Sequence, residues 1–463
     1  MSTAMKKGDM TTGKPLPTIL RFSLPVFFSQ LLQQLYNTAD TMIVGRFLGL
    51  DALAAVGSTW ALNYLIVYFC TGICYGVGIP VAQQFGAGNV KRMRRCFINA
   101  VYLVLFFMVL LTTLTVVFCR PMQIVTKTPT DVLDAAYIYL VIIFAGLPCT
   151  FLLNFCFGIL MAMGDSKLPS LFMAVSTVLN LILDLLLIIT VQMGVAGAAL
   201  ATVLSQLISG LCCLIYMLKR YAVLRPARGD LCPHLSTIFH VARISVPMGL
   251  QYSITAIGAV MLQSSINAVG TAAVAGFSAA YKIKGLFLCP IQAVGTALST
   301  YVGQNYGAQK IGCICRGVKQ TLIVGWIYAA VVMAVFLLAC YPLSMIFVDT
   351  GETEVIGYSV QLLRWLSFCY FELAVLLPVR YAVQGMGQSV LSLCSGLAEM
   401  LTRIIFAIFL IPIYGYTAAC ISEGATFLAG ALVIVPIYLL LLHKQRQDLS
   451  LSAVRDNDLS GCS

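Results

Sequence analysis

The stretch "QQFGAGN", residues 83–89, returns in modified form as "QNYGAQK", residues 304–310. Three more pairs follow the same order at a spacing of 220 to 223 residues: "RFSLP" (21–25) with "RISVP" (243–247), "ALAAVGS" (52–58) with "AAVAGFS" (272–278), and "MGDS" (163–166) with "MGQS" (386–389). A repeat of this length, in the same order along the chain, predicts two homologous halves that pack as separate lobes.

Composition gives the class of protein in which these halves occur. The 463 residues are 60% hydrophobic and only 10% charged, whereas soluble domains have about 25% charged residues. Apolar runs long enough to cross a hydrocarbon core of roughly 30 Å recur along the whole chain. The sequence therefore predicts an all-α polytopic membrane protein.

Turn residues and charges divide the apolar runs into twelve predicted spans, six in each half. The spans cover residues 17–44, 53–80, 97–119, 136–161, 168–190, 194–218, 240–268, 272–301, 318–347, 357–383, 389–412 and 415–442. We expect an N-lobe at 17–218 and a C-lobe at 240–442, with a basic linker at 219–239 and tails at 1–16 and 443–463. Because six spans return the chain to the side of the membrane where it started, both lobes are predicted to have the same orientation and to form pseudo-symmetric six-helix bundles.

Basic residues set the predicted orientation. Of the 28 Lys and Arg residues, 20 lie in the tails and in the loops on the same side as the tails. By the positive-inside rule, both termini are predicted to be cytoplasmic, in the cell membrane. Because the net charge of +11 follows this topology, it does not indicate a nucleic-acid partner.

Two acids lie inside predicted spans of the N-lobe. Asp40 follows Arg21 by 19 residues and Asp184 follows Lys167 by 17, which places them about 28 Å and about 25 Å from the side with the termini, at 1.5 Å per residue. Asn180 precedes Asp184 by one helical turn. Thr202 and Tyr139 are expected to enter the same layer from neighbouring spans.

Two carboxyl groups with an amide, a hydroxyl and a phenol favour a cation site. The carboxyl pair can share and release a proton, or the same oxygens can bind a hard cation such as Na⁺. Asp40, Asn180, Asp184 and Thr202 are the predicted Na⁺ ligands in that second case. The alternative is a pair of neutral or paired structural acids. No Lys or Arg is assigned to the first six spans, which argues against an ion pair there.

The second half has other charges. Glu399 and Arg403, four residues apart on one span, are predicted to form a structural pair. Glu372 is expected at the depth of Lys282 and Lys284, and either lysine is a candidate partner. Glu372 and Lys282 are secondary candidates for functional residues.

Polytopic proteins with an internal repeat of this kind are more often transporters than anything else. The energy source for transport is predicted to be an ion gradient, because the sequence lacks the G-x-x-x-x-G-K-[ST] motif of ATP-hydrolysing proteins. The repeated "QQFGAGN" and "QNYGAQK", together with "MGDSKLPS" and "NLILD", resemble the multidrug and toxic compound extrusion (MATE) transporters over residues 16–442. Within that family the sequence is most similar to the DNA-damage-inducible (DinF-like) branch.

The resemblance implies a V-shaped antiporter that exports organic, often cationic and aromatic compounds by alternating access, without a cofactor, in exchange for H⁺ or Na⁺. It also implies that Asp40, Asn180, Asp184 and Thr202 couple transport to the cation, with Tyr139 beside them. Gln34, Asn37, Asn154 and Met173 are the predicted substrate contacts. The related Na⁺-driven norfloxacin exporters have a glutamate where this chain reads "PMGLQYSITAIGAVML" (247–262) without an acid.

Other functions stay open at this point. A flippase for a lipid-linked precursor has the same architecture but needs a cationic cleft for the pyrophosphate. A channel or a membrane-embedded enzyme is a third possibility, although no catalytic motif is evident and the chain is expected not to be an enzyme. Each chain holds a complete predicted pathway, so we expect it to work as a monomer in the lipid bilayer, with small organic molecules as its partners.

Overall fold

The computed structural model describes residues 8–126, 128–225, 231–349 and 351–460, and these residues form helices and short connections without a strand. Lys6, Lys7, Lys127 and Arg228, four of the basic residues in the predicted tails and loops, lie outside the described residues. The first half contains α2 (Pro15–Gly86), α3 (Val90–Val117), α4 (Cys119–Val125), α5 (Leu133–Ala145), α6 (Leu147–Ala162), α7 (Lys167–Leu185) and α8 (Val195–Arg220). The second half contains α9 (Leu235–Asn267), α10 (Thr271–Gly307), α11 (Ile311–Ser344), α12 (Thr353–Gly385), α13 (Ser389–Ile405) and α14 (Ile411–Ser460).

Twelve membrane-crossing segments are obtained once the breaks inside the longest helices are considered. In the described part of the chain, 9 helices are long and apolar enough to cross a membrane, or 10 if α5 and α6, bent by 46°, count as one span. Helix α2 is broken at Gly49, and its segment before this break is one further span. The helical run Ser389–Gln445, counted above as one helix, is broken at Gly415 and so contains two spans. The prediction of twelve spans is confirmed in this sense.

The two halves have matching backbone irregularities. Gly194, which precedes α8, has φ 61° and ψ −141°, and Gly415 at the equivalent place has φ 58° and ψ −140°. These left-handed conformations favour glycine because it has no Cβ. A π-helix also precedes each of these glycines, at Leu186–Thr190 and at Phe406–Leu410. The internal repeat in the sequence is therefore a repeat in the structure.

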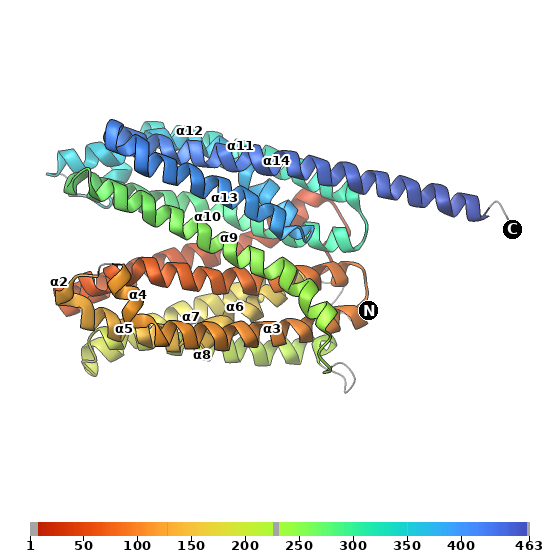
Figure 1. The fold of residues 1–463 in the computed structure, drawn as a ribbon, viewed down its shortest axis with the longest axis horizontal. Helices are drawn as coiled ribbons and strands as arrows, with labels where there is room; N and C mark the ends of the chain where they lie inside the picture. Colours follow the sequence, from red (N-terminus) through yellow and green to blue (C-terminus); the bar gives the residue numbers. More distant parts are fainter. Residues whose placement is uncertain (1–7, 127, 226–230, 350, 461–463) are drawn as a thin grey trace.

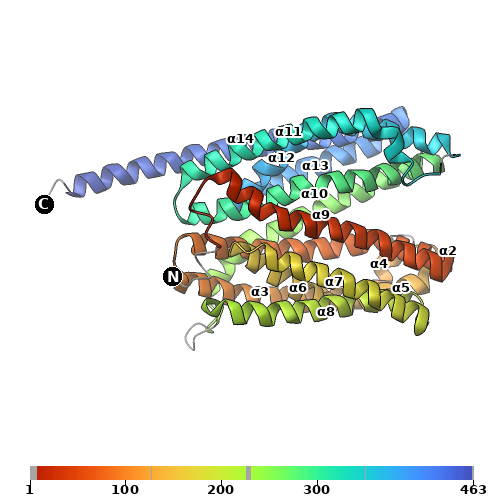
Figure 2. The same ribbon diagram turned by 180° about the vertical axis from the view of Figure 1, so that it is seen from behind.

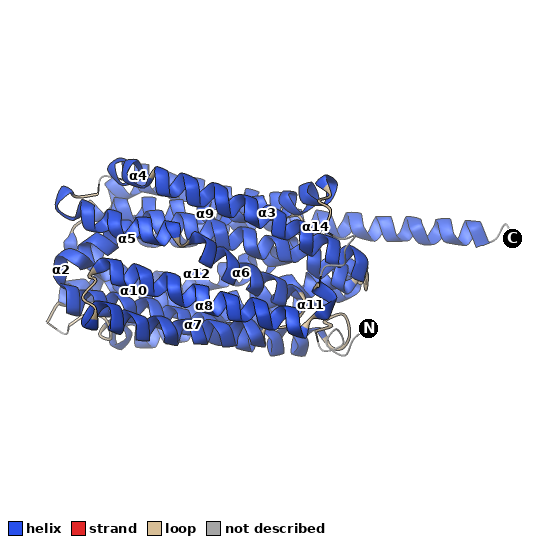
Figure 3. Cartoon of the chain, turned by 90° about the horizontal axis from the view of Figure 1, so that it is seen from below, coloured by secondary structure: helices blue, strands red, loops and turns tan. Residues whose placement is uncertain are grey.

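Figure 1 shows the two halves as two bundles side by side, with α2 to α8 below and α9 to α14 above. Each bundle has its own apolar core, around Phe144 and Phe151 in the first and around Phe336 and Tyr370 in the second. The two termini lie at the same end of the molecule, where α14 projects beyond the body, and we call this the terminal end. Seen from below, in Figure 3, the chain is helical throughout, with short connections at both ends.

The first helix of each half starts against the other half. The backbone N–H of Leu16 donates to Gln320 Oε1 of α11 at 3.1 Å, and the N–H of His234 donates to Asn99 Oδ1 of α3 at 2.9 Å. In Figure 2 the start of α2, drawn in dark red, runs obliquely from the α10–α11 side toward the first bundle. The expected lobe boundaries at residues 17 and 240 therefore fall where the chain is still packed on the opposite bundle.

Helices α3, α7 and α11 are the outermost elements. The most apolar windows of these three helices are only 22% buried inside the protein, and Leu338 of α11 is 86% exposed. Apolar side chains on an outer helix are stable in contact with lipid, because hydrocarbon tails are as apolar as the protein interior. The polar residues instead gather inside the two bundles and between them.

Candidate functional site

The predicted acids of the first bundle come together. Asp184 on α7 is fully buried, and its carboxyl group is close enough to that of Asp40 for the two to interact electrostatically. With its amide oriented to suit both neighbours, Asn180 donates to Asp184 Oδ2 at 2.9 Å and accepts from the Thr202 backbone N–H at 3.1 Å. We call Asp40, Asp184, Asn180 and Thr202 the acidic cluster.

Two tyrosines border the acidic cluster. Tyr36, one turn before Asp40 on α2, places its hydroxyl 3.2 Å from Thr202 Oγ1. Tyr139 of α5 is buried and close enough to interact electrostatically with Asp40 and Asp184, as the sequence predicted. The sequence analysis did not single out Tyr36, although the i, i+4 spacing to Asp40 places both on one helix face.

No basic side chain of the described residues forms an ion pair with either acid of this cluster. One oxygen of each carboxyl group, Asp40 Oδ1 and Asp184 Oδ1, is buried without a hydrogen-bond partner. A buried carboxylate without compensation costs several kcal/mol in order of magnitude, so a proton or a bound cation has to neutralise it. The carboxyl groups of the acidic cluster can therefore take up a proton or a cation.

The backbone near Asp184 departs from a regular α-helix. The π-helix Leu186–Thr190 begins two residues after Asp184. A π-turn shifts the side chains that follow it relative to those that precede it, and such turns are frequent at functional sites. Here the irregularity lies at the end of α7 next to the acids.

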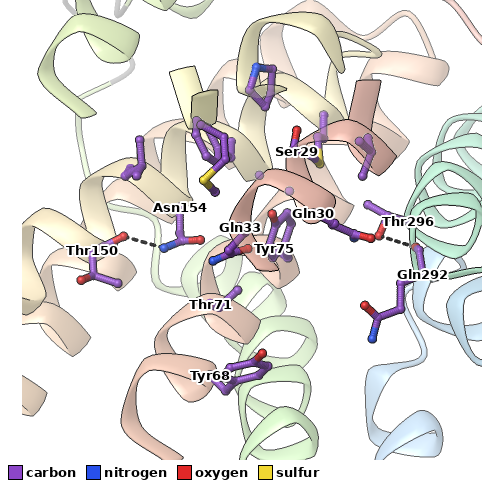
Figure 4. A pocket seen from close by; sticks show the side chains of 18 of the residues that line it. Ser29, Gln30, Gln33, Tyr68, Thr71, Tyr75, Thr150, Asn154, Gln292 and Thr296 are labelled. Carbon is purple, nitrogen blue, oxygen red and sulfur yellow. Dashed lines mark hydrogen bonds between the residues drawn. The ribbon is translucent and has the colours of Figure 1, made fainter. Parts of the chain in front are cut away.

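A cavity of about 290 Å³ lies beside the acidic cluster and between the bundles. Its walls come from α2, α6, α7 and α8 on one side and from α9, α10 and α12 on the other. The lining is polar through amides, hydroxyls and phenols, and it contains no Asp, Glu, Lys, Arg or His. Figure 4 shows Gln30 and Gln33 of α2 in this space, with Gln292 and Thr296 of α10 on the opposite wall.

Two of the four predicted substrate contacts line the cavity. Asn154 and Met173 do so, whereas Gln34 and Asn37 are not among the lining residues. The Gln34 amide instead packs against α10 at Gly285. The residues of α2 that take this place are Gln30, Gln33 and Tyr36. The prediction placed the correct helix at the cavity but chose partly the wrong face, because the rotation of a helix about its axis depends on its packing.

Three side chains belong both to the cavity lining and to the surroundings of the acids. Tyr36, Asn180 and Thr202 line the cavity and bond to one another or to Asp184. A molecule in the cavity that displaced any of these groups would disturb the hydrogen bonds around the acids. The cavity and the acidic cluster therefore form one continuous site.

The second bundle contains buried charges that compensate each other. Lys284 Nζ lies 2.5 Å from Glu423 Oε2, and the Tyr281 hydroxyl also donates to Glu423. Arg403 Nη2 lies 4.0 Å from the same carboxylate. Glu423, an acid inside a long apolar run, was not singled out from the sequence, although that position was the available signal.

The predicted pairs of the second half are wrong. Glu399 pairs with Arg380 of α12 and not with Arg403, because α12 brings a guanidinium closer than the helix that carries Glu399. Lys284 pairs with Glu423, and Lys282 points its ammonium at the Phe347 ring, 5.8 Å from the centroid. Glu372 has neither lysine as a partner, and its Oε2 is buried without a hydrogen bond among the described residues.

Two pseudo-symmetric bundles of membrane-crossing helices around a shared polar cavity define a polytopic membrane transporter. The chain belongs to the MatE family, whose sequence profile matches residues 25–186 and 246–409, one match in each half. It is a transporter and not an enzyme.

Relatives with described names agree with this family. The chain is 29% identical over 384 residues to "Probable multidrug resistance protein YpnP" of Bacillus subtilis, covering 79% of this chain and 81% of the relative. It is 24% identical to the "FAD transporter" of Shewanella oneidensis, covering 79% of each chain.

Solved structures confirm the fold. A MATE structure in complex with MaL6 superimposes with a TM-score of 0.89 at 22% identity, covering 96% of this chain and 100% of the other. An outward-facing multidrug resistance MATE transporter has a TM-score of 0.87 at 23% identity, covering 96% and 99%.

Proposed function

We propose that this chain is a secondary active antiporter that exports organic compounds in exchange for H⁺ or Na⁺ by alternating access. The observation that carries the proposal is the pair of acids beside the cavity, with Asp184 buried and Asp40 half-buried, and with no basic partner for either among the described residues. A cation neutralises the acids when it enters, and its release leaves charges that favour the opposite conformation. Substrate and cation then compete through Tyr36, Asn180 and Thr202.

The cavity walls support organic, aromatic cargo. Tyr68, Tyr75, Tyr252 and Tyr381 offer ring faces, and side-chain amides and hydroxyls offer hydrogen bonds without a fixed charge. Aromatic faces attract organic cations by about 0.5–2 kcal/mol each. A flippase for a pyrophosphate-linked precursor, or a carrier for FAD such as the Shewanella relative, would need cationic groups for the phosphates, and the lining has none.

The acidic cluster suits either ion. The two carboxyl groups can share one proton, and four oxygen-bearing side chains can surround Na⁺, which prefers oxygen ligands. We further propose that both termini are cytoplasmic, that the protein resides in the cell membrane, and that one chain is sufficient for transport. The moving units would be the lobes 17–218 and 240–442.

The test is efflux of a fluorescent organic cation from proteoliposomes under an imposed pH or Na⁺ gradient. We expect Asp40→Asn and Asp184→Asn to reduce gradient-driven efflux to background while substrate binding, measured by fluorescence polarisation, persists. The gradient that drives the wild type identifies the ion. Asp134→Asn is the matched control, because Asp134 is 85% exposed, pairs with Arg120 and does not line the cavity.

Two outcomes would reject the proposal. If both acid variants pump as well as the wild type, the acidic cluster does not couple transport and Glu372 becomes the next acid to test. If the wild type moves no organic cation under either gradient, the flippase becomes the better hypothesis, and translocation of a fluorescent lipid should then be measured.

A further inference from the structure

The repeated motifs meet at the terminal end of the two bundles. Gln83 Nε2 of α2 donates to the Gly385 carbonyl of α12 at 3.1 Å, and Gln304 Nε2 of α10 donates to the Ala162 carbonyl of α6 at 3.1 Å. Each glutamine thus reaches from its own bundle to the end of a helix in the other bundle. The two hydrogen bonds are pseudo-symmetric partners.

Two glycines of the same motifs let the helices touch. A Cβ on Gly86 would collide with the Gln304 carbonyl, and a Cβ on Gly307 would collide with the Gln83 carbonyl. Backbone contact of this kind excludes water and substrate from the gap between the bundles. We call this double contact, formed by Gln83, Gly86, Gln304 and Gly307, the gate, and the cavity lies deeper inside, with Ala82, Ala162 and Thr300 in its lining.

The chain before α2 is hydrogen-bonded to Gln304, the glutamine that the second bundle contributes to the gate. Gln304, fully buried, accepts from the Met10 N–H at 2.8 Å and donates to the Gly8 carbonyl at 3.2 Å, while Asn305 Nδ2 donates to the Met10 carbonyl at 3.2 Å. Met10 itself is 4% exposed and belongs to the apolar core of the second bundle. This is extensive burial for a stretch without regular secondary structure.

The same stretch also contacts the first bundle. Gly8 packs so closely on Met163 and Gly164, at the end of α6, that a side chain would not fit there. Asp9 Oδ1 accepts hydrogen bonds from the Thr11 N–H at 2.8 Å and its hydroxyl at 2.7 Å, which fixes the turn. Lys310 Nζ donates to the Thr11 carbonyl at 2.9 Å. Residues 8–14, which we call the strap, therefore bridge both bundles.

We infer that the strap is a latch that holds the gate shut, so that the cavity opens at the terminal end only when residues 8–14 leave Gln304 and Gly164. The inference rests on the proposed alternating access, because only a transporter of that kind has to open this end. Strap and gate share Gln304, so releasing the strap removes bonds that orient the amide for Ala162. Gln83, the pseudo-symmetric residue, has no bond to the strap.

The test measures the distance between the bundles in the full chain by double electron–electron resonance. Spin labels on non-canonical residues at the exposed positions 91 and 312, the matching starts of α3 and α11, avoid the 17 cysteines of the sequence. We expect Gly8→Val, and separately deletion of residues 2–13, to raise the long-distance population about tenfold, as the loss of a few hydrogen bonds implies. Thr12→Val, an exposed strap position, should change nothing.

The variant Gln83→Leu distinguishes the contribution of the gate from that of the strap. We expect this variant to raise the same population, since it breaks the gate and leaves the strap bound. If Gln83→Leu opens the terminal end and neither strap variant does, or if no variant opens it, the latch is refuted. The distance needs neither substrate nor gradient, so failure of the efflux experiment and failure of the latch are separate results.

Discussion

The two bundles treat buried acids in opposite ways. Thr202 follows Gly194 by eight residues, and Glu423 follows Gly415 by eight, so the two residues occupy equivalent positions. In the first bundle the neighbours of Thr202 are Asn180 and the acid pair, with no basic partner among the described residues. In the second bundle Glu423 is held by Lys284 and Tyr281, with Arg403 nearby.

On the proposed function, this difference separates an acid pair that a transported ion neutralises from an acid that the protein itself neutralises. The second bundle neutralises its acid with its own side chains, and removing one partner leaves a buried charge. The first bundle leaves its acids to be neutralised from outside. Duplication built the same scaffold twice, and substitutions at equivalent positions then gave one half the features of a cation site and the other half a fixed ionic core.

Of the variants that test this comparison, Lys284→Met should have the largest effect, a loss of stability. It leaves Glu423 buried without its closest basic partner, which costs about 3–5 kcal/mol of unfolding free energy. Unfolding by SDS titration in mixed micelles measures the change. Lys282→Met is the control, since Lys282 is exposed and its ammonium faces the Phe347 ring without an ion-pair partner among the described residues, a contact worth about 1 kcal/mol or less. Equal effects of the two variants would show that the ion pair does not stabilise the second bundle.

Asp184→Asn should raise the unfolding free energy, whereas Lys284→Met lowers it. Removing an uncompensated buried charge raises the unfolding free energy by about 1–3 kcal/mol when the coupling ion is scarce. Adding that ion should stabilise the wild type and no longer stabilise the variant, because only the folded wild type binds it. Thermal unfolding during Na⁺ titration and during acidification measures both parts. A variant that is less stable than the wild type under all conditions would make Asp184 a structural acid.

Tyr36→Phe should have a smaller effect, on the ion concentration needed for efflux, because Tyr36 connects the cavity with the acidic cluster. It removes the hydroxyl that lies 3.2 Å from Thr202 Oγ1 and keeps the ring in the cavity. The loss of one neutral hydrogen bond, about 1 kcal/mol, predicts roughly a fivefold change in the ion concentration that gives half-maximal efflux. Tyr68→Phe, on the same cavity and without contact to Thr202, should leave that concentration unchanged. If both variants shift it alike, the hydroxyl of Tyr36 has no special role.

Glu372→Gln should have the smallest effect. Its carboxyl group lies near Gly424 and has no ion-pair partner in the described part of the chain. Because Glu372 is half-buried whereas Asp184 is fully buried, we expect a gain in unfolding free energy of about 1 kcal/mol or less and unchanged gradient-driven efflux. A loss of efflux in this variant would place a second coupling acid in the second bundle and weaken the contrast between the halves.

Much of the architecture was predictable from local pattern. Lipid leaves backbone groups no partner except those within a helix, so apolar runs give spans directly. The repeated motifs predicted two equivalent bundles, and the spacing of Asp40 and Asp184 from basic residues predicted one common depth. Those inferences need only the rise of a helix and the thickness of a bilayer.

Contacts between helices were less predictable. Glu399 and Arg403 are neighbours on one helix, yet Arg380 of α12 takes the carboxylate. Gln34 and Gln33 are adjacent in sequence, but only Gln33 lines the cavity. Each outcome depends on the rotation of a helix and on which element packs beside it, and neither quantity is encoded in a single segment.

The sequence alone determined the family of folds, the duplication, the number of spans and the unusual placement of two acids, because hydropathy and spacing act locally. Only the tertiary structure decided that Glu423 has a basic partner, that the start of α2 lies on the opposite bundle, and that residues 8–14 bridge both bundles. Ion pairs and hydrogen bonds act over about 3 Å, so the partner of a buried group is settled only when the helices are packed.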